Sequence, residues 1–150
     1  LIKSAEGPEK KETHVRIVRQ ETSLKMRQLM RLVVTEGTGG NAEVPGYMVG
    51  GKTGTADKAE NGRYAKGKRM SSFMGVFPIN DPKYAVFIMV DEPNPNKKSY
   101  GFATAGWVAA PAVGRVISSM APLLNMEPLK DQADISEPLH QFVSIKAQDH

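Results

Sequence analysis

Two apolar runs joined by a very short turn constrain the fold of this chain most. The runs cover residues 70–77 and 83–91, and the Ile79-Asn80-Asp81-Pro82 segment between them has residues typical of a tight turn. Such a short connection predicts an antiparallel hairpin, because parallel strands need a much longer crossover. The second run is nearly all apolar, which predicts a strand covered on both faces.

A third strand is predicted before this hairpin, over residues 46–56. Tyr47, Met48 and Val49 favour extended backbone. Residues 57–69, which follow, are polar and read as a long connection. We therefore expect three neighbouring antiparallel strands, with the strand that carries Lys52 at one edge of the group.

Two helices are predicted, one before and one after these strands. The first covers Glu21 to Glu36, where apolar residues recur at helical spacing. Its expected buried face comprises Met26, Leu29, Met30, Val33 and Val34, with Lys25, Arg27 and Arg31 outside. The second runs from about Trp107 to Leu124, with Pro111 in its first turn. Its expected apolar face comprises Val113, Val116, Ile117 and Met120. The fold class is therefore α+β, an antiparallel sheet flanked by helices.

The chain divides into one domain and two polar ends. Residues 1–13 are predicted to form a polar N-terminal loop. Polar and apolar residues alternate over residues 14–18, which predicts a short edge strand. Residues 14–128 form the domain, and residues 129–150 are expected to be a disordered polar tail. The chain begins at Leu1, so we expect a cut or processed piece of a longer protein.

Composition excludes several classes of function. The 150 residues suffice for one small domain, and cysteine is absent, so neither disulfides nor thiolate metal sites are expected. No residue pattern indicates a metal or cofactor site. The net charge of +4 comes largely from a basic stretch after the first strand. Only Tyr64 is aromatic in that stretch, so the stacking residues expected of a nucleic-acid-binding surface are missing. The longest apolar run is too short to span a bilayer.

Residues 50–55 carry the strongest functional signal. They combine three glycines, one lysine and two threonines. Glycine allows another backbone to come close, lysine supplies a positive charge, and threonine supplies a short, stiff hydroxyl. This combination is typical of a segment that holds an anion against main chain.

Two known patterns fit this segment. Residues 46–53 match the phosphate-binding loop G-x-x-x-x-G-K-[ST], and Lys52-Thr53-Gly54 matches the K-T-G motif of penicillin-recognising serine acyltransferases. The phosphate loop requires a helix that opens at the Lys-Thr pair. Residues 54–62 contain two glycines and no apolar period, so they predict no such helix. The nucleotide-binding alternative is therefore the weaker of the two.

Several further segments fit the K-T-G alternative. Residues 36–39 (Glu-Gly-Thr-Gly), 44–47 (Val-Pro-Gly-Tyr) and 51–56 occur in the order and spacing of one family, as do Ser72-Phe73, Asp91-Glu92-Pro93 and Ala109-Ala110-Pro111. The chain resembles the C-terminal part of the transpeptidase domain of a class B penicillin-binding protein. The division-type, FtsI-like peptidoglycan D,D-transpeptidases are the most similar branch. The resemblance covers roughly residues 15–128.

The resemblance implies a fold and a role for each site residue. The fold would be the penicillin-binding protein/β-lactamase-like one, with a five-stranded antiparallel sheet. Substrate would lie along the Lys52 strand as an added strand. Lys52 would provide positive potential and assist proton transfer, and Thr53 and Thr55 would bind the substrate carboxylate through their hydroxyls. The Thr55 backbone N–H would be an oxyanion donor, and Gly54 would leave room for the bound peptide.

The catalytic serine of the family is absent. No serine of the chain has lysine three positions later or asparagine two positions later, so neither S-x-x-K nor S-x-N is present. We expect the nucleophile in an upstream half of the same domain and expect this segment alone to be inactive. A non-catalytic relative of the same fold remains an alternative function.

The resemblance also implies partners and a location. The expected ligands are a peptidoglycan stem peptide and β-lactam antibiotics, with cell-division or cell-wall synthesis proteins of the membrane as further partners. The parent protein would be membrane-anchored, with this domain on the periplasmic face of the bacterial inner membrane.

Overall fold

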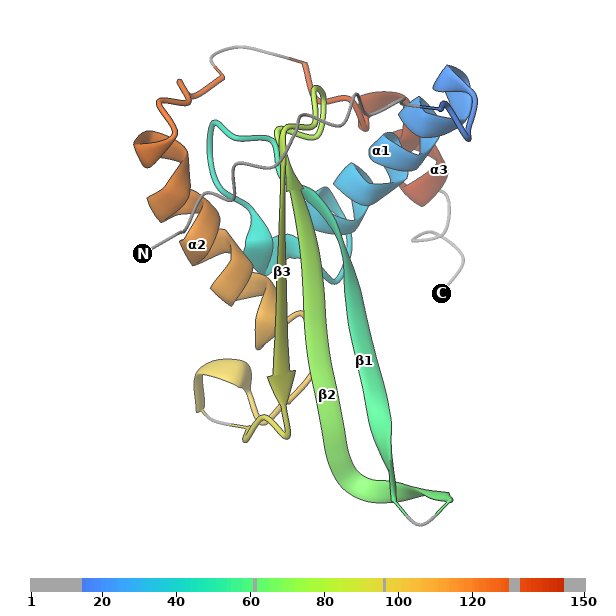
Figure 1. The fold of residues 1–150 in the computed structure, drawn as a ribbon, viewed down its shortest axis with the longest axis vertical. Coiled ribbons are helices and arrows are strands. Elements are labelled where there is room, and N and C mark those ends of the chain that lie inside the picture. Colours follow the sequence, from blue (N-terminus) through green and yellow to red (C-terminus); the bar gives the residue numbers. More distant parts are fainter. Residues whose placement is uncertain (1–14, 61, 96, 130–132, 145–150) are drawn as a thin grey trace, which may run out of the picture.

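The computed structural model describes residues 15–60, 62–95, 97–129 and 133–144. The described residues form one antiparallel sheet with helices packed beside it (Figure 1). The strands are β1 (Gly50–Glu60), β2 (Arg63–Phe77) and β3 (Tyr84–Asp91). The helices are α1 (Gln20–Thr35), α2 (Ala109–Leu123) and α3 (Glu137–Ser144), with 3₁₀ turns η1 (Gly40–Ala42) and η2 (Lys97–Ser99). The α+β class predicted from the sequence is confirmed.

The sheet has the predicted strand order. Its order is β1-β2-β3, and both neighbouring pairs are antiparallel. The short turn after Phe77 joins β2 to β3 as the expected hairpin. The strand that carries Lys52 pairs only with β2 in the described part of the chain, so its other edge is unpaired there. The five strands that the resemblance implied exceed the three described ones.

The core lies between the sheet and α2. Phe73 and Phe77 of β2 are fully buried, as are Val113 and Ile117 of α2. Gly75 lies between the two phenylalanines, and a Cβ there would come within 2.7 Å of the Val113 side chain. Helix α2 therefore packs directly on the middle of β2. The predicted position of Pro111 in the first turn of α2 is confirmed, but Val116 of the expected buried face is exposed.

Strand β3 is covered on one face instead of two. Val86 and Ile88 pack against the core, whereas Phe87 and Met89 on the other face are 62% and 56% exposed. The prediction of a doubly covered strand is wrong for the described chain, because α2 covers only one face of the sheet. This leaves Met74, Phe87 and Met89 exposed on the other face.

Strand β1 begins later than the sequence predicts. Residues 46–49 form a loop, in which Gly46 and Met48 have positive φ angles of 85° and 41°. Tyr47, Met48 and Val49 are nonetheless buried. Their apolar character reflects burial in the core and not membership of a strand.

The polar connection predicted over residues 57–69 is instead the far end of a long β-hairpin. Strand β1 continues to Glu60 and β2 starts at Arg63, and both extend past the helices in Figure 1. Charged side chains pair across this ribbon, with Arg69 Nε 3.0 Å from Asp57 Oδ1 and Lys68 Nζ 2.5 Å from Glu60 Oε1. The prediction failed because a ribbon with no core to cover has no apolar alternation.

Helix α1 has the predicted bounds within one residue but a different buried face. Val34 is buried as expected, whereas Met26 and Leu29 are about half exposed. Arg31, which was expected outside, is 7% exposed. Its guanidinium pairs with Glu43 and Asp134 and donates to the Val49 carbonyl at 2.7 Å. Burial of this charge is possible because all of these acceptors surround it.

Both chain ends differ from the sequence predictions. Residues 15–18 form no strand, and Val15 and Ile17 are 78% and 90% exposed, since no strand pairs with them in the described chain. The expected disordered tail is wrong for residues 133–144, which contain α3. Helix α3 lies beside α1 (Figure 1), and Asp134 just before it accepts from Arg31 Nε at 2.6 Å. Residues 1–14, 130–132 and 145–150 lie outside the described residues.

The Asp134 carboxylate gives the attachment of this C-terminal segment a pH dependence. Burial raises the pKa of Asp134, but hydrogen bonds from Ser136 and the Arg31 charge outweigh burial and hold the pKa below its ordinary value. A depressed carboxyl pKa stabilises the fold above the unfolded value of about 3.9, and this stabilisation is lost as the pH falls through the folded pKa.

We therefore expect Asp134→Asn to destabilise the whole protein at pH 7 by about 1–2 kcal/mol. The difference from wild type should shrink as the pH falls below about 4, because the wild-type carboxylate then becomes protonated and is uncharged like the asparagine. Urea unfolding at several pH values measures it. Asp81→Asn is the matched control, because the Asp81 side chain is 77% exposed. A difference that stays constant from pH 7 to pH 2 would contradict the role of the charge.

Candidate active site

The four predicted site residues are consecutive in β1 and alternate between its two faces. The register pairs Thr53 with Phe73 and Thr55 with Ser71, both of which are fully buried on the α2 side of the sheet. Lys52 pairs with Met74, on the exposed apolar face. Successive strand residues point to opposite faces. The structure therefore brings the two threonines together and places Lys52 on the other side of the strand.

The position of Lys52 and Thr53 inside a strand excludes the phosphate loop. Strand β1 continues past both residues to Glu60, and the next element is strand β2 and not a helix. A phosphate loop needs a helix N-terminus at this point. The nucleotide-binding alternative is wrong.

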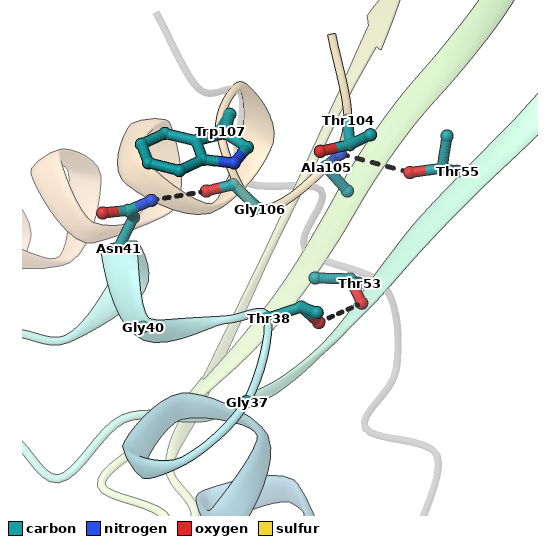
Figure 2. Close-up of a pocket in the computed structure, with 10 residues that line it drawn as sticks. All are labelled: Gly37, Thr38, Gly40, Asn41, Thr53, Thr55, Thr104, Ala105, Gly106 and Trp107. Atoms are coloured by element: carbon teal, nitrogen blue, oxygen red, sulfur yellow. Dashed lines mark hydrogen bonds between the residues drawn. The ribbon is translucent and has the colours of Figure 1, made fainter. Parts of the chain in front are cut away.

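Each threonine hydroxyl has one partner from a neighbouring loop. The Ala105 backbone N–H donates to Thr55 Oγ1 at 3.1 Å, and Thr38 Oγ1 lies 3.1 Å from Thr53 Oγ1 (Figure 2). A hydroxyl has one hydrogen to donate and two lone pairs. Because Thr55 accepts from Ala105, its own hydrogen remains available to a ligand.

The two hydroxyls open into one cavity of about 470 Å³. The polar side chains that line it carry hydroxyls, apart from one side-chain amide. Trp107 forms one wall (Figure 2). The lining residues are Gly37, Thr38, Gly40, Asn41, Thr53, Thr55, Thr104, Ala105, Gly106 and Trp107. Among the residues that the structure describes, no carboxylate lines this cavity, so it suits a ligand that accepts hydrogen bonds.

Two loops form the walls of this cavity and are joined to each other. Asn41 Nδ2 donates to the Gly106 carbonyl at 2.8 Å. A Cβ on Gly106 would lie 2.3 Å from the Thr38 carbonyl oxygen, so only glycine permits this approach of the loops. The loop after α1 and the loop before α2 therefore form one frame around the threonines.

Lys52 lines a second cavity of about 430 Å³, between β1 and α1. Its Nζ donates to the Thr53 carbonyl at 2.7 Å. The other lining residues are mainly apolar, namely Met26, Leu29, Met30, Leu32, Val33, Glu36, Gly37 and Gly51. A ligand that contacts both Lys52 and the threonines must therefore lie along the unpaired edge of β1.

Gly54 has a packing reason within the chain itself. A Cβ at this position would lie 2.6 Å from Ser72 Oγ on β2. Ser72 Oγ in turn donates to the Gly54 carbonyl at 3.3 Å. The space that sequence reasoning attributes to a bound peptide is thus also required by the neighbouring strand.

Sequence reasoning missed the cavity residues that β1 does not supply. Thr38 belongs to the Glu-Gly-Thr-Gly turn, which supported the resemblance but received no role. Trp107, which the sequence places at the start of the second helix without a role, is 39% exposed and lines the cavity. Tyr100 and Phe102 lie against Trp107, with ring centroids 5.2 and 6.4 Å from its own. The signal that could have found Trp107 is its closeness to these two aromatics in the sequence.

The described residues contain no group of three or more His, Asp or Glu side chains arranged to hold a metal ion. Among the same residues, no helix is long and apolar enough to cross a membrane.

Comparison with known proteins identifies relatives of this chain. The family model described as the penicillin binding protein transpeptidase domain matches residues 1–114. A probable peptidoglycan D,D-transpeptidase FtsI of Caulobacter vibrioides is 46% identical over 121 residues, which cover 75% of this chain and 20% of the relative. Stage V sporulation protein D of Bacillus subtilis is 42% identical over 118 residues, covering 79% of this chain and 18% of the relative. The chain thus spans about a fifth of the curated relatives that it matches.

Solved structures of similar fold agree with these relatives. Penicillin-binding protein 3 of Mycobacterium tuberculosis, complexed with ampicillin, matches with a TM-score of 0.67 and 28% identity, covering 80% of this chain and 28% of that one. The transpeptidase domain of penicillin-binding protein 3 of Burkholderia pseudomallei matches with a TM-score of 0.62 and 34% identity, covering 75% and 32%. The expected penicillin-binding protein/β-lactamase-like fold is therefore confirmed. The chain belongs to the penicillin-binding protein transpeptidase domain family.

Proposed function

We propose that this chain supplies the substrate-binding strand of a peptidoglycan D,D-transpeptidase. The observation that carries the proposal is the pair of hydroxyls on Thr53 and Thr55, which open into one cavity beside an unpaired strand edge. A stem peptide ending in D-Ala-D-Ala offers a backbone to pair with that edge and a terminal carboxylate for the hydroxyls. A β-lactam offers the same carboxylate.

Each site residue has a distinct part in this proposal. Thr53 and Thr55 donate to the carboxylate, and the Thr55 backbone N–H stabilises the oxyanion of the tetrahedral intermediate. Lys52 acts from the opposite face of β1, where its ammonium provides positive potential and assists proton transfer to the leaving group. Gly54 keeps the strand edge open to the substrate backbone.

The reaction is an acyl transfer in two steps. A serine oxygen bonds to the carbonyl carbon of the penultimate D-Ala, the peptide bond to the last D-Ala breaks, and the departing amine takes up the serine proton. An amine of a second stem peptide then attacks the ester, forms the cross-link, and returns a proton to the serine oxygen.

The serine comes from the upstream half of the same domain in this proposal. Exposed apolar surface supports such a partner, because Met74, Phe87 and Met89 on the sheet are 41–62% exposed. Met26 and Leu29 of α1 add apolar area beside Lys52. Contiguous apolar surface of this kind marks a contact region. A segment seated there would bring its own side chains next to the Lys52 ammonium.

The location and the further partners follow from the same proposal. The parent protein is membrane-anchored, and this domain faces the periplasm, where peptidoglycan is cross-linked. Its partners are cell-division or cell-wall synthesis proteins of the membrane.

Fluorescent penicillin tests the proposal on the full-length protein. We expect one covalent adduct per protein, detected by intact mass, on a serine upstream of residue 1. The isolated 150-residue chain is the control and should take up no label. An unlabelled full-length protein that is folded by circular dichroism would contradict the proposal, as would label on the isolated chain.

A further inference from the structure

Thr38 contacts the candidate carboxylate site without belonging to its strand. It follows α1, fifteen positions before Thr53 in the sequence, and its Oγ1 lies 3.1 Å from Thr53 Oγ1 (Figure 2). Among the described residues, no other side chain is hydrogen-bonded to the Thr53 hydroxyl. The orientation of that hydroxyl therefore depends on Thr38.

Donor counting shows what this contact does. Each hydroxyl has a single hydrogen, so only one of the two can donate across the pair. When a carboxylate enters the cavity, the Thr53 hydrogen forms a charge-assisted bond to it, which is stronger than a bond between neutral hydroxyls. Thr38 then donates to Thr53 Oγ1, and the two hydroxyls form a short chain that ends on the ligand.

The loop that contains Thr38 is held against the loop before α2 by two contacts at Gly106. Gly106 approaches the Thr38 carbonyl so closely that a Cβ would be only 2.3 Å from it, and Asn41 bonds to the Gly106 carbonyl. The same loop presents the Ala105 N–H to Thr55. Both threonines of β1 are thus oriented by one frame, through a hydroxyl at Thr53 and an amide at Thr55.

We propose that Thr38 is a positioning residue for the Thr53 hydroxyl, and that it increases the preference of the site for ligands with a carboxylate. The inference rests on the proposed function, in which Thr53 donates to that carboxylate. Thr38 does not touch the reacting atoms. Its effect should appear only with ligands whose carboxylate is intact.

The test compares benzylpenicillin with its methyl ester on the full-length protein. In Thr38→Val, which keeps the shape and loses the hydroxyl, we expect the second-order rate constant of acylation by benzylpenicillin to fall about fivefold. Acylation by the methyl ester should be unchanged. Thr38→Ser restores the hydroxyl and should recover the wild-type rate with benzylpenicillin. In a Thr53→Val background, Thr38→Val should cause no further loss.

The outcomes separate this inference from the proposed function. An unacylated wild-type protein overturns both. Wild-type acylation with equal losses for acid and ester in Thr38→Val overturns only the role of Thr38, because such losses indicate a structural effect. No loss with either ligand also overturns it. Melting temperatures of the variants show whether each one is folded during the assay.

Discussion

Replacing Lys52 with alanine is expected to lower the rate of acylation of the full-length protein by penicillin by about 10²–10³-fold. The ammonium is a fixed charge beside the strand proposed to bind the ligand, and preorganised charges of this kind stabilise the charge that develops in the transition state. Its Nζ already lies on the strand backbone, 2.7 Å from the Thr53 carbonyl, so it needs little rearrangement to act.

Two variants make the Lys52 result interpretable. Lys83→Ala removes an exposed lysine near the start of β3, which β2 separates from β1 in the sheet, and should leave the rate unchanged. Lys52→Arg retains the charge but replaces a compact ammonium with a planar guanidinium, so it should recover only part of the rate. A Lys52→Ala protein that is acylated at the wild-type rate would remove Lys52 from the mechanism.

Replacing Arg31 with alanine is expected to destabilise the domain by about 3 kcal/mol, which is near the lower end of the cost of breaking a buried ion pair. The Arg31 side chain is 8% exposed, and its guanidinium connects three segments through Glu43, Asp134 and the Val49 carbonyl. The lower end applies because the Glu43 and Asp134 side chains are 38% and 26% exposed and water can solvate them in part.

Thermal and urea unfolding of the full-length protein measure this effect. Arg115→Ala is the matched control, because Arg115 lies on the exposed side of α2 and should change stability little. Arg31→Ala should also free the C-terminal segment, seen as faster amide exchange in residues 137–144. Loss of stability without faster exchange there would show that the Arg31–Asp134 pair does not hold α3 in place.

The sequence predicts the elements whose causes are local. The β2–β3 hairpin follows from two apolar runs and a turn, and α1 and α2 follow from helical spacing of apolar residues. Arg31 shows the limit of such reasoning. A charged residue at a helical position is normally solvated, and its burial depends on Glu43 and Asp134, 12 and 103 positions away.

The residues of the candidate site likewise fall into those that the sequence predicts and those that it does not. Lys52, Thr53, Gly54 and Thr55 are recognisable because their motif is contiguous. Thr38 and Trp107 are not, since only the packing of two loops places them around β1. The ribbon over residues 57–69 was missed for a third reason, because its pairing depends on cross-strand charges, for which apolar periodicity gives no signal.

Successive side chains of β1 point to opposite faces of the sheet, and this has a consequence for how such a domain can evolve. Lys52 has α1 as its neighbourhood, whereas the threonines have the two loops on the other side of the sheet. Substitutions in α1 can alter the surroundings of the charge while the hydroxyls keep theirs, and changes in the loops can do the reverse. One strand thus carries two groups, the ammonium and the pair of hydroxyls, whose surroundings can change independently of each other.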